Sequence, residues 1–392
     1  MRFDTAYFDA GIQRKNTGCE KWDDPGVLPE GGVPLWVADM DFPCPPAVEE
    51  AVKQRAAHPC FGYNNSQAED RCTDALLSFW QRRHGLTLKR ESCMTLPCVI
   101  TGLKLCVRAF TAPGDRVAMF TPVYGPFYSA VKLNGRLVAA VPLAADAEGR
   151  YPMNLKGMEE ALRGGAKLIM LCSPHNPLSR LWTGEELAAL VKLAAAYKAP
   201  IVCDEIHADF VYAPGRFTPI LSVEGAAERA VMLCAASKTF NVAGLQQAAA
   251  AALDETLIAA LKKESDAAGV TSGNAFALAA TEAAYRAGDA WLDGLIAYLD
   301  GNRRALREFA EEKLPRARLA PIEATYLAWI DLRAYGLTCE EMQKRCYRHG
   351  VAFTGGTFFG PEGEGFLRVN FGCPRRQLLE GMERLCAALK EE

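Results

Sequence analysis

The feature that most constrains the fold is a series of short, continuously apolar runs that alternate with helical segments in the middle of the chain. The runs are "RVAMF" (116–120), "RLVAAV" (136–141), "KLIMLC" (167–172), "PIVCD" (200–204) and "AVMLCA" (230–235). The segments between them that predict helices are 125–135, 154–164 and 183–198. Strands that are apolar on both faces are typical of a parallel sheet covered by helices on each side. The order therefore predicts an α/β fold with a largely parallel sheet.

The chain has 392 residues, and single cores stop growing at about 250–300 residues, so we expect two parts. Residues 1–50 are Pro-rich and look irregular, and a helix is predicted to begin at Pro45. A long helical region is expected over 255–314, followed by the run 325–332, a helix near 338–349 and a final strand–helix pair. We predict an N-terminal arm that joins part of a small domain (1–50), a large domain (51–286) and a small α+β C-terminal domain (287–392).

Composition excludes several classes of protein. The net charge of −3 gives no reason to expect nucleic acid or an anionic membrane as a partner. No apolar run approaches the roughly 18–20 residues of a membrane span, and the charged N-terminus lacks the apolar stretch of a signal peptide. The 14 cysteines are scattered and form no CxxC pair. We therefore expect a cytoplasmic protein in a reducing compartment, with no disulfide framework and no metal site.

Chemically distinctive side chains follow the apolar runs, where open α/β sheets bind their ligands. They are Tyr124, Asn176, Asp204 and Lys238, and a later strand adds Arg368. A lysine can form a Schiff base with a carbonyl cofactor, and a carboxylate can keep a pyridine nitrogen protonated. An amide can donate to a phenolic oxygen, and a tyrosine ring can stack on a flat heterocycle. A guanidinium is the best two-point partner for a substrate carboxylate.

Each of these residues also has an ordinary structural explanation. Lys238 could be a surface lysine, Asp204 a helix cap, Asn176 part of a Pro-rich turn, Tyr124 a core residue and Arg368 a member of a salt bridge. No single residue decides between the two interpretations. Their order along the chain favours the functional one.

The sequence resembles the fold-type I, aminotransferase-like enzymes that use pyridoxal 5′-phosphate (PLP), and more narrowly their MalY/PatB-type cystathionine β-lyase (C–S lyase) branch. The segments that carry the resemblance span nearly the whole chain; they include "LPEGGVPLWVADMDFPCPPAV" (28–48), "TPVYGPF" (121–127), "CDEIHADF" (203–210), "ASKTFNVAGLQ" (236–246) and "GEGFLRVNFGCPR" (363–375). This resemblance implies a mostly parallel seven-stranded sheet between helices.

The resemblance also implies roles for the five residues. Lys238 would hold PLP as a Schiff base and act as the proton-transfer base, and Asp204 would pair with the pyridine nitrogen. Asn176 would reach the phenolic oxygen of the cofactor, and Tyr124 would stack on its ring; both would also lie against the substrate. Arg368 would bind the substrate α-carboxylate.

Further residues are implied around the cofactor. The backbone N–H groups of Val99 and Ile100 would hold the phosphate, as helix N-termini do. Tyr63 would reach the phosphate of the neighbouring subunit, so the resemblance implies a homodimer with shared sites. His207 would serve as a second group near the phenolic oxygen. Two positions depart from the usual pattern, because Ala235 and Gln246 stand where relatives place a phosphate-binding Ser and Arg, and Ser237 would take over part of that role.

Three functions stay open on the sequence alone. The resemblance implies a carbon–sulfur β-lyase that converts L-cystathionine or other cysteine S-conjugates to a thiol, pyruvate and ammonia. An aminotransferase would use the same five residues, although Gln246 in place of Arg slightly disfavours it. A regulatory interaction protein on the same fold is the third, and the intact Lys238, Asp204 and Arg368 argue against it as the only role.

Overall fold

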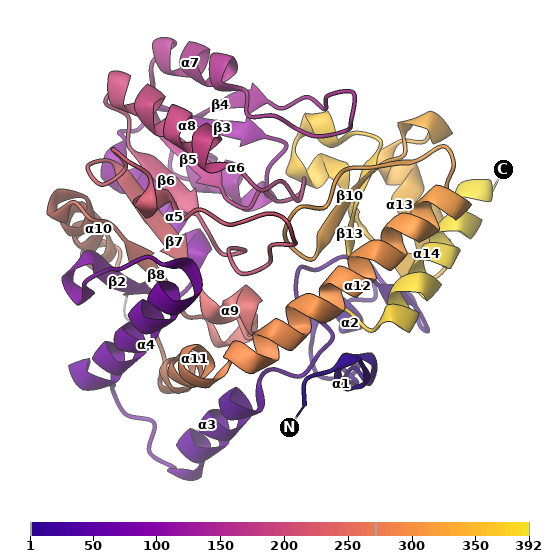
Figure 1. Cartoon of the computed structure of the whole chain (residues 1–392), viewed down its shortest axis with the longest axis horizontal. Coiled ribbons are helices and arrows are strands. Elements are labelled where there is room, and N and C mark those ends of the chain that lie inside the picture. The colour runs from indigo at the N-terminus through magenta and orange to yellow at the C-terminus, as the bar shows by residue number, and fades with distance from the viewer. Residues whose placement is uncertain (1, 271–272, 392) are drawn as a thin grey trace.

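The computed structural model describes residues 2–270 and 273–391, and its central feature is a seven-stranded sheet in the order β2-β8-β7-β6-β5-β3-β4 (Figure 1). Neighbouring strands from β7 to β4 are all parallel, whereas β8 runs antiparallel to both β7 and β2. The strands are β2 (Cys93–Leu96), β3 (Arg116–Thr121), β4 (Leu137–Pro142), β5 (Ala166–Cys172), β6 (Ile201–Asp204), β7 (Ala230–Cys234) and β8 (Ala248–Ala251). The predicted α/β class and mostly parallel sheet are confirmed.

Helices cover both faces of this sheet, as the doubly apolar strands predict. On β3, Val117 and Met119 pack into one hydrophobic cluster, while Ala118 and Phe120 pack into the other. The first cluster includes residues of α5 (Val99–Phe110), α6 (Gly125–Lys132) and α10 (Glu255–Ala267). The second includes residues of α7 (Leu155–Arg163) and α8 (Gly184–Ala196). Burial on both sides explains why the strands contain almost no polar residue before their carboxyl ends.

The predicted helical region after residue 255 consists of three helices. α10 is followed by α11 (Ala275–Ala287), whose start is capped by the Asn274 side chain, and by α12 (Asp289–Lys313). α11 also packs on α3 (Pro46–Ala57) and α4 (Ser66–His84). Gly288 separates α11 from α12, and a Cβ at this position would lie 2.3 Å from a ring carbon of Phe240. The long α12 then extends from the large sheet towards the C-terminal part of the chain (Figure 1).

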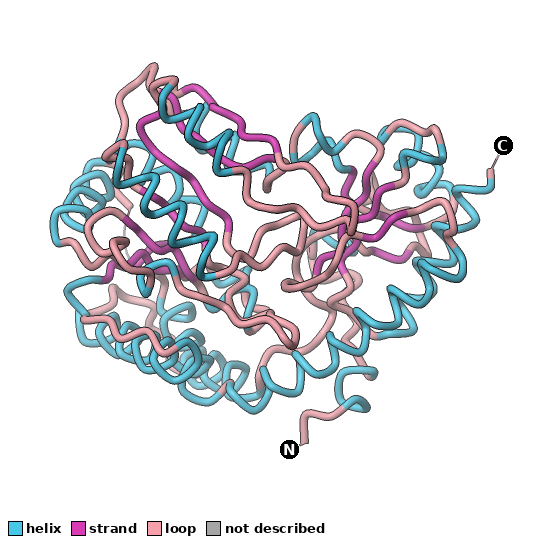
Figure 2. Tube along the Cα trace, turned by 45° about the horizontal axis from the view of Figure 1, so that its top comes forward, coloured by secondary structure: helices cyan, strands magenta, loops and turns pink. Residues whose placement is uncertain are grey.

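The C-terminal part is built on a second, antiparallel sheet in the order β12-β13-β10-β9, seen to the right of the large sheet in Figure 2. Its strands are β9 (Arg318–Leu319), β10 (Leu327–Asp331), β12 (Thr354–Gly355) and β13 (Phe366–Asn370). α13 (Cys339–Arg348) and α14 (Arg375–Lys390) accompany it. The expected small α+β unit is therefore present, while the exact domain limits stay a prediction.

The N-terminal stretch is more ordered than its Pro-rich sequence suggests. It contains α1 (Thr5–Asp9) and α2 (Glu20–Asp23), and β1 (Val33–Pro34) pairs in parallel with β11 (Val351–Ala352). Phe8 of α1 is fully buried against Trp291 and Tyr298 of α12. This packing ties the arm to the C-terminal part. The remaining short elements are α9 (Ala236–Thr239) and 3-10 turns at Arg90–Ser92, Ile220–Ser222, Ala243–Leu245, Arg333–Tyr335, Gly356–Phe359 and Pro361–Gly363.

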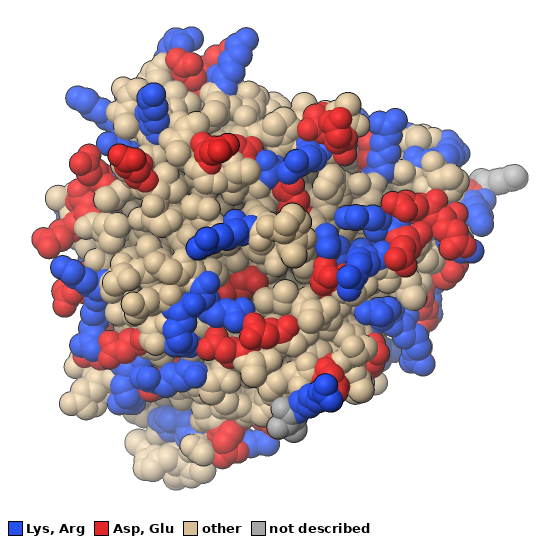
Figure 3. Space-filling model, in the orientation of Figure 1, with Lys and Arg blue, Asp and Glu red and all other residues tan. Residues whose placement is uncertain are grey.

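The surface carries mixed charge. On the face drawn in Figure 3, basic and acidic side chains are interspersed, and neither sign covers the face alone. All fourteen cysteines are free. Within residues 2–270 and 273–391, none of the helices combines the length and apolar character needed to span a bilayer.

Candidate active site

The side chains predicted to carry chemistry meet at one edge of the large sheet. Asp204 is the last residue of β6, and its register partners are Cys172 at the end of β5 and Leu233 near the end of β7. Asn176 and Lys238 each lie four residues after the ends of β5 and β7, and Tyr124 lies three residues after the end of β3. Because these strands are adjacent and parallel, their carboxyl ends bring the residues to the same edge.

Lys238 lies on the short helix α9, and its Nζ donates a hydrogen bond to the carbonyl oxygen of Ala38, 2.6 Å away. Burial lowers the pKa of Lys238 to about 8, although the charges of Asp39 and Asp204 act in the opposite direction. A substantial fraction of the amine is therefore unprotonated slightly above neutral pH. Such an amine can act as a nucleophile towards a carbonyl group or as a base.

Asp204 is a buried carboxylate without a cation in direct contact. Its Oδ1 accepts a hydrogen bond from the N–H of Ile206 at 3.1 Å, and its side chain forms no salt bridge within the described ranges. Burial raises the pKa of Asp204 to about 7, while the Ile206 N–H and the charge of Lys238 oppose the shift. A positively charged ligand group beside this carboxylate would lower that pKa and hold the carboxylate ionised.

We expect Asp204→Asn to stabilise the ligand-free protein more at alkaline than at acidic pH. Because the folded-state pKa of about 7 lies above the ordinary value of 3.8, the stabilisation from this carboxyl is complete below about pH 4 and is lost as the pH rises to about 7. Asparagine carries no charge and loses no stability over this range. The free energy of unfolding of the variant, minus that of the wild type, should therefore be about 2–3 kcal/mol larger near pH 8 than near pH 5.

Urea unfolding of both ligand-free proteins across this pH range would measure the difference. Asp266→Asn, at an exposed position on α10, is the matched control. Its free energy of unfolding should differ from that of the wild type by an amount that does not change with pH. If the difference for Asp204→Asn is also independent of pH, the raised pKa of Asp204 is contradicted.

Arg368 supplies an uncompensated positive charge next to Asn176. It is buried on β13, and its Nη1 donates to Asn176 Oδ1 at 3.3 Å. Its Nη2 donates to the Trp36 carbonyl (2.6 Å) and to Thr354 Oγ1 (3.1 Å), and its Nε has no partner. No carboxylate pairs with it among the residues described, and burial lowers the pKa of Arg368 to about 10. The salt-bridge alternative for Arg368 is therefore wrong, and the guanidinium is available for an anionic ligand group.

His207 and Tyr124 line the same region. His207 is buried, its Nδ1 has no hydrogen-bond partner, and burial together with Lys238 and Arg368 lowers its pKa to about 3. It is therefore neutral. Tyr124 is partly buried, with its ring 5.9 Å from that of Phe358.

The start of α5 lies at the same edge of the sheet. β2 and β7 both run antiparallel to β8, so β2 points in the same direction as β7. Val99 and Ile100, which follow β2 and open α5, therefore lie at the same edge of the sheet as α9, which contains Ser237, and the first N–H groups of a helix have no acceptor within the helix. Ala235 is the N-cap of α9 and Gln246 ends the next 3-10 turn with a φ of 57°. Neither adds a positive charge to this part of the site.

Tyr63 is the one predicted residue that the chain does not bring into the site. Its side chain is fully exposed, with a relative exposure of 108%, and the neighbouring Phe61 packs on Phe276. Tyr63 is therefore not part of the aromatic core of its own chain.

Sequence reasoning missed the contribution of the segment 36–42 to the site. Its motif "WVADMDF" carried the family resemblance, but no chemical role was assigned to it. The carbonyls of Trp36 and Ala38 accept hydrogen bonds from Arg368 and Lys238. Every residue has such a carbonyl, so side-chain patterns hold no signal for this role. Asn370 could have been noticed, because it lies two residues after Arg368 on one strand and so shares its face.

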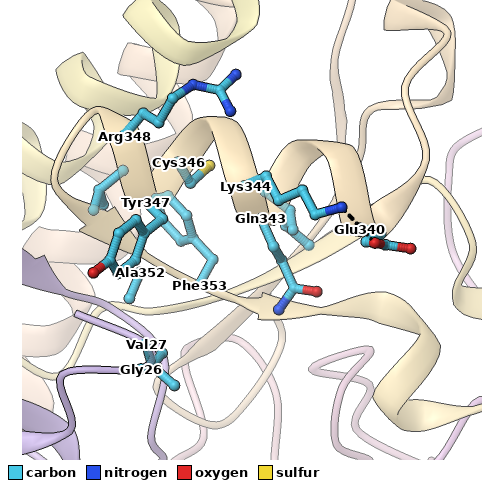
Figure 4. A pocket seen from close by; sticks show the side chains of 12 residues that line it. Gly26, Val27, Glu340, Gln343, Lys344, Cys346, Tyr347, Arg348, Ala352 and Phe353 are labelled. Carbon is cyan, nitrogen blue, oxygen red and sulfur yellow. Dashed lines mark hydrogen bonds and ion pairs between the residues drawn. The ribbon is translucent and has the colours of Figure 1, made fainter. Parts of the chain in front are cut away.

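A separate cavity of about 440 Å³ lies between residues 26–27 and α13, with Leu367 in its wall (Figure 4). Lys344 and Glu340 form an ion pair at 2.6 Å in this view. Successive side chains of a strand point to opposite faces, so Arg368 points away from this cavity. The cavity is therefore distinct from the candidate site. No cluster of three or more potential metal ligands occurs in the part of the chain that the structure describes.

Comparisons with known proteins agree with this architecture. The model of the family "aminotransferase class I and II" matches residues 31–385. Cystathionine beta-lyase PatB of Bacillus subtilis (strain 168) is 40% identical over 387 residues, covering 97% of this chain and 99% of that protein.

Two solved structures are similar over almost their full length. A PLP-bound putative aminotransferase from Clostridium difficile 630 has a TM-score of 0.94 and 32% identity, covering 98% of this chain and 99% of that one. Cystalysin from Treponema denticola, which contains a pyridoxal 5′-phosphate cofactor, has a TM-score of 0.91 and 31% identity, with 97% and 98% covered. The chain therefore belongs to the class I and II aminotransferase family, within the branch that contains PatB.

Proposed function

We propose that this protein is a PLP-dependent carbon–sulfur β-lyase, which converts L-cystathionine or related cysteine S-conjugates to a thiol, pyruvate and ammonia. One observation carries the proposal. Lys238, with a pKa lowered to about 8, lies at the same sheet edge as the buried carboxylate of Asp204 and the uncompensated guanidinium of Arg368. The similarity to cystathionine beta-lyase PatB over 97% of the chain favours the β-lyase within the family.

The residues at the sheet edge fit PLP. Lys238 would hold the cofactor covalently, and the buried carboxylate of Asp204 matches a protonated pyridine nitrogen. The unpartnered Nδ1 of His207 and the amide of Asn176 are polar groups for the ring oxygen, and Tyr124 offers a ring to stack on. When bound, PLP supplies a carbonyl for the amine and a protonated ring that withdraws electrons from the substrate Cα.

The phosphate of PLP would lie at the start of α5. The N–H groups of Val99 and Ile100 and the hydroxyl of Ser237 are the donors there, and the positive end of the helix dipole favours an anion. Since Ala235 and Gln246 are uncharged, this part of the site depends on neutral donors. We propose that residues 51–286 bind the cofactor and that the 287–392 part supplies Arg368.

The reaction then assigns one task to each side chain. Arg368 binds the α-carboxylate through two N–H groups and so fixes which Cα bond faces the ring. The amine of Lys238 would remove the Cα proton, and the carboxylate of Asp204 would favour a protonated pyridine nitrogen when PLP is bound. The Cβ–S bond breaks with release of a thiolate, and the remaining enamine hydrolyses to pyruvate and ammonia.

The direct test is product analysis. Purified protein supplied with PLP and a panel of cysteine S-conjugates should release thiol and pyruvate in equal amounts without any 2-oxo acid. A protein that only transfers the amino group, and only when a 2-oxo acid acceptor is added, would be an aminotransferase, and the β-lyase proposal would be abandoned. S-Methyl-substituted and larger conjugates in the same panel would define which thiols are accepted.

We further propose a homodimer with shared active sites in the cytoplasm. Tyr63 is fully exposed on a segment held to the same chain by Asn64, whose amide donates to the Gly273 carbonyl at 2.8 Å. A large aromatic side chain presented in this way suits contact with a second subunit. The fourteen free cysteines suit a reducing compartment, and the mixed surface charge gives no support for a nucleic-acid partner.

Tyr63→Phe should weaken PLP retention by about ten- to a hundredfold, because a hydrogen bond to a charged phosphate is lost. Dialysis followed by PLP titration would measure the affinity. The sharper experiment refolds two inactive variants together, Tyr63→Ala and Lys238→Ala. Mixed dimers should regain one site, built from Tyr63 of one chain and Lys238 of the other. Mixed dimers that form but stay inactive would count against shared sites.

A further inference from the structure

The segment 36–42 crosses the candidate site, and its backbone carbonyls accept hydrogen bonds from side chains of the C-terminal sheet and of the segment that follows β7. The Trp36 carbonyl accepts from Arg368 and Thr354, and the Ala38 carbonyl accepts from Lys238 and Tyr326. The carbonyls of Met40 and Phe42 accept from the amide of Asn241, each at 2.8 Å. These contacts join the segment to residues between 199 and 332 positions away in the chain, so the backbone of the segment needs an anchor.

Asn370 is that anchor. Its side chain is completely buried on β13, two residues after Arg368. Its Nδ2 donates to the carbonyls of Val37 and Asp39, the latter at 2.7 Å, and its Oδ1 accepts from the N–H of Gly372 at 2.8 Å. One amide group therefore holds the carbonyl on each side of Ala38, and Lys21 Nζ also donates to the Asp39 carbonyl at 3.1 Å, which leaves the intervening peptide little freedom to turn.

The carbonyl oxygen of Ala38 accepts a hydrogen bond from the amine of Lys238. It accepts from Lys238 Nζ at 2.6 Å and from the Tyr326 hydroxyl at 2.8 Å. A carbonyl oxygen can only accept, so the amine must point an N–H at it in either protonation state. When the amine is neutral, its lone pair then has to point elsewhere. The direction of the Ala38 carbonyl thus restricts the direction in which the free amine can take up a proton.

We propose that Asn370 is a positioning residue: by holding the carbonyls of Val37 and Asp39, it aims the Ala38 carbonyl at Lys238 and so orients the free amine that removes the Cα proton. The proposal rests on the function proposed above. It concerns the step in which the free amine of Lys238 takes up the Cα proton. The Asn370 side chain contacts neither the amine of Lys238 nor the Cα proton of the substrate. It acts through the backbone of residues 37–39.

The molecule contains a matched control in Asn302. This asparagine on α12 is also completely buried, and its Nδ2 also donates to two carbonyls two residues apart, those of Phe371 (3.0 Å) and Cys373 (2.8 Å). Neither carbonyl receives a hydrogen bond from Lys238 or Arg368. Truncating Asn302 removes a buried amide of the same kind that makes no hydrogen bond to the segment 36–42. It also frees the Phe371–Gly372 peptide, whose N–H donates to Asn370 Oδ1, so this variant measures how much is lost by loosening that support alone.

The experiment compares Asn370→Ala with Asn302→Ala. For Asn370→Ala we expect kcat to fall by about 30-fold or more, because general-base efficiency depends on orientation, with KM within about threefold of the wild-type value. The primary isotope effect with Cα-deuterated substrate should increase, since proton removal becomes slower relative to the other steps. Asn302→Ala should leave kcat within about threefold and the isotope effect unchanged. Equal effects in the two variants, or an unchanged isotope effect in Asn370→Ala, would overturn the proposal.

A second readout needs no turnover. In the cofactor-free protein, the pH dependence of Lys238 labelling by an amine-specific reagent, followed by mass spectrometry, reports the proton affinity of this amine. The hydrogen bond to Ala38 favours the charged amine, so Asn370→Ala should shift the labelling midpoint to lower pH and Asn302→Ala should not. A shift in neither variant would contradict the proposal, whereas a wild-type protein that releases no pyruvate would contradict the β-lyase function instead.

Asn370→Ser covers the case in which the alanine variant does not fold. Its hydroxyl can donate to one of the two carbonyls but not to both, so kcat and the labelling midpoint should lie between those of the wild type and the expected alanine values. A well-folded Asn370→Ser protein with wild-type isotope effect and labelling midpoint would refute the positioning role.

Discussion

Replacing Lys238 with Ala should abolish turnover and the absorbance band that a lysine-bound cofactor gives near the visible–ultraviolet boundary. Lys238 is the amine that the fold places at the carboxyl ends of the parallel strands, beside Asp204 and with a pKa lowered to about 8 by burial. Alanine can neither hold the cofactor covalently nor accept the Cα proton. General-base catalysis alone contributes about 10²–10⁴-fold, and loss of the covalent link adds to this.

A spectrum of the variant supplied with PLP, together with pyruvate release from a cysteine S-conjugate, would measure both effects. Circular dichroism and thermal unfolding would verify that the variant folds. A small primary amine added to the buffer should restore part of the activity in proportion to its concentration, because it can enter the space left by the side chain. Turnover near the wild-type rate without added amine would show that Lys238 is not the catalytic base.

Replacing Asp204 with Ala should slow turnover by at least about 100-fold, which corresponds to about 3 kcal/mol of barrier. In the proposed reaction this buried carboxylate would keep the pyridine nitrogen protonated, and without it the ring would withdraw electrons less strongly. Some cofactor should still bind, because Lys238 and the start of α5 are unchanged. Steady-state kinetics at saturating PLP would separate the loss of rate from any loss of affinity.

Glu205→Gln is the matched control for Asp204. Glu205 is the next residue and is also buried, and burial raises its pKa to about 8. Its Oε1 accepts from the N–H of Ile220 at 2.7 Å, a bond that glutamine can keep. We expect kcat within about threefold of wild type for this variant. A change of less than threefold for Asp204→Ala as well would mean that Asp204 only shapes the turn at Ile206.

The strands that position the site could be predicted from local sequence, with two exceptions. The five predicted apolar runs correspond to β3, β4, β5, β6 and β7 within one or two residues at either end. β2 and β8 were missed, because β8 consists only of alanines over Ala248–Ala251 and β2 is four residues long. Alanine has a low strand propensity, and only burial between β7 and β2 makes this segment a strand. The break between α11 and α12 was also missed, since it depends on Gly288 packing against Phe240.

Most of the candidate site residues could be picked out from the sequence alone. Tyr124, Asn176, Asp204 and Lys238 each follow an apolar run, and parallel strands bring such positions to one edge whatever the other details of the fold. Arg368 was found through its motif, since a strand of the other sheet has no fixed place relative to this edge. The strand order and the residue types therefore indicated where the reactive groups lie, whereas their roles and Arg368 came from the family resemblance.

What only the tertiary structure decided is the environment that tunes these residues. The lowered pKa of Lys238 and the raised pKa of Asp204 follow from burial, which results from the packing of both sheets and the N-terminal arm. The contact between Lys238 and the Ala38 carbonyl joins residues 200 positions apart, and its acceptor is a backbone atom that every residue possesses. The outward direction of Tyr63 depends in the same way on how its segment packs. A sequence specifies which groups are present, whereas the distances and the polarity around them arise only when remote segments pack together, because proton affinity and hydrogen bonding depend on surroundings within a few ångströms.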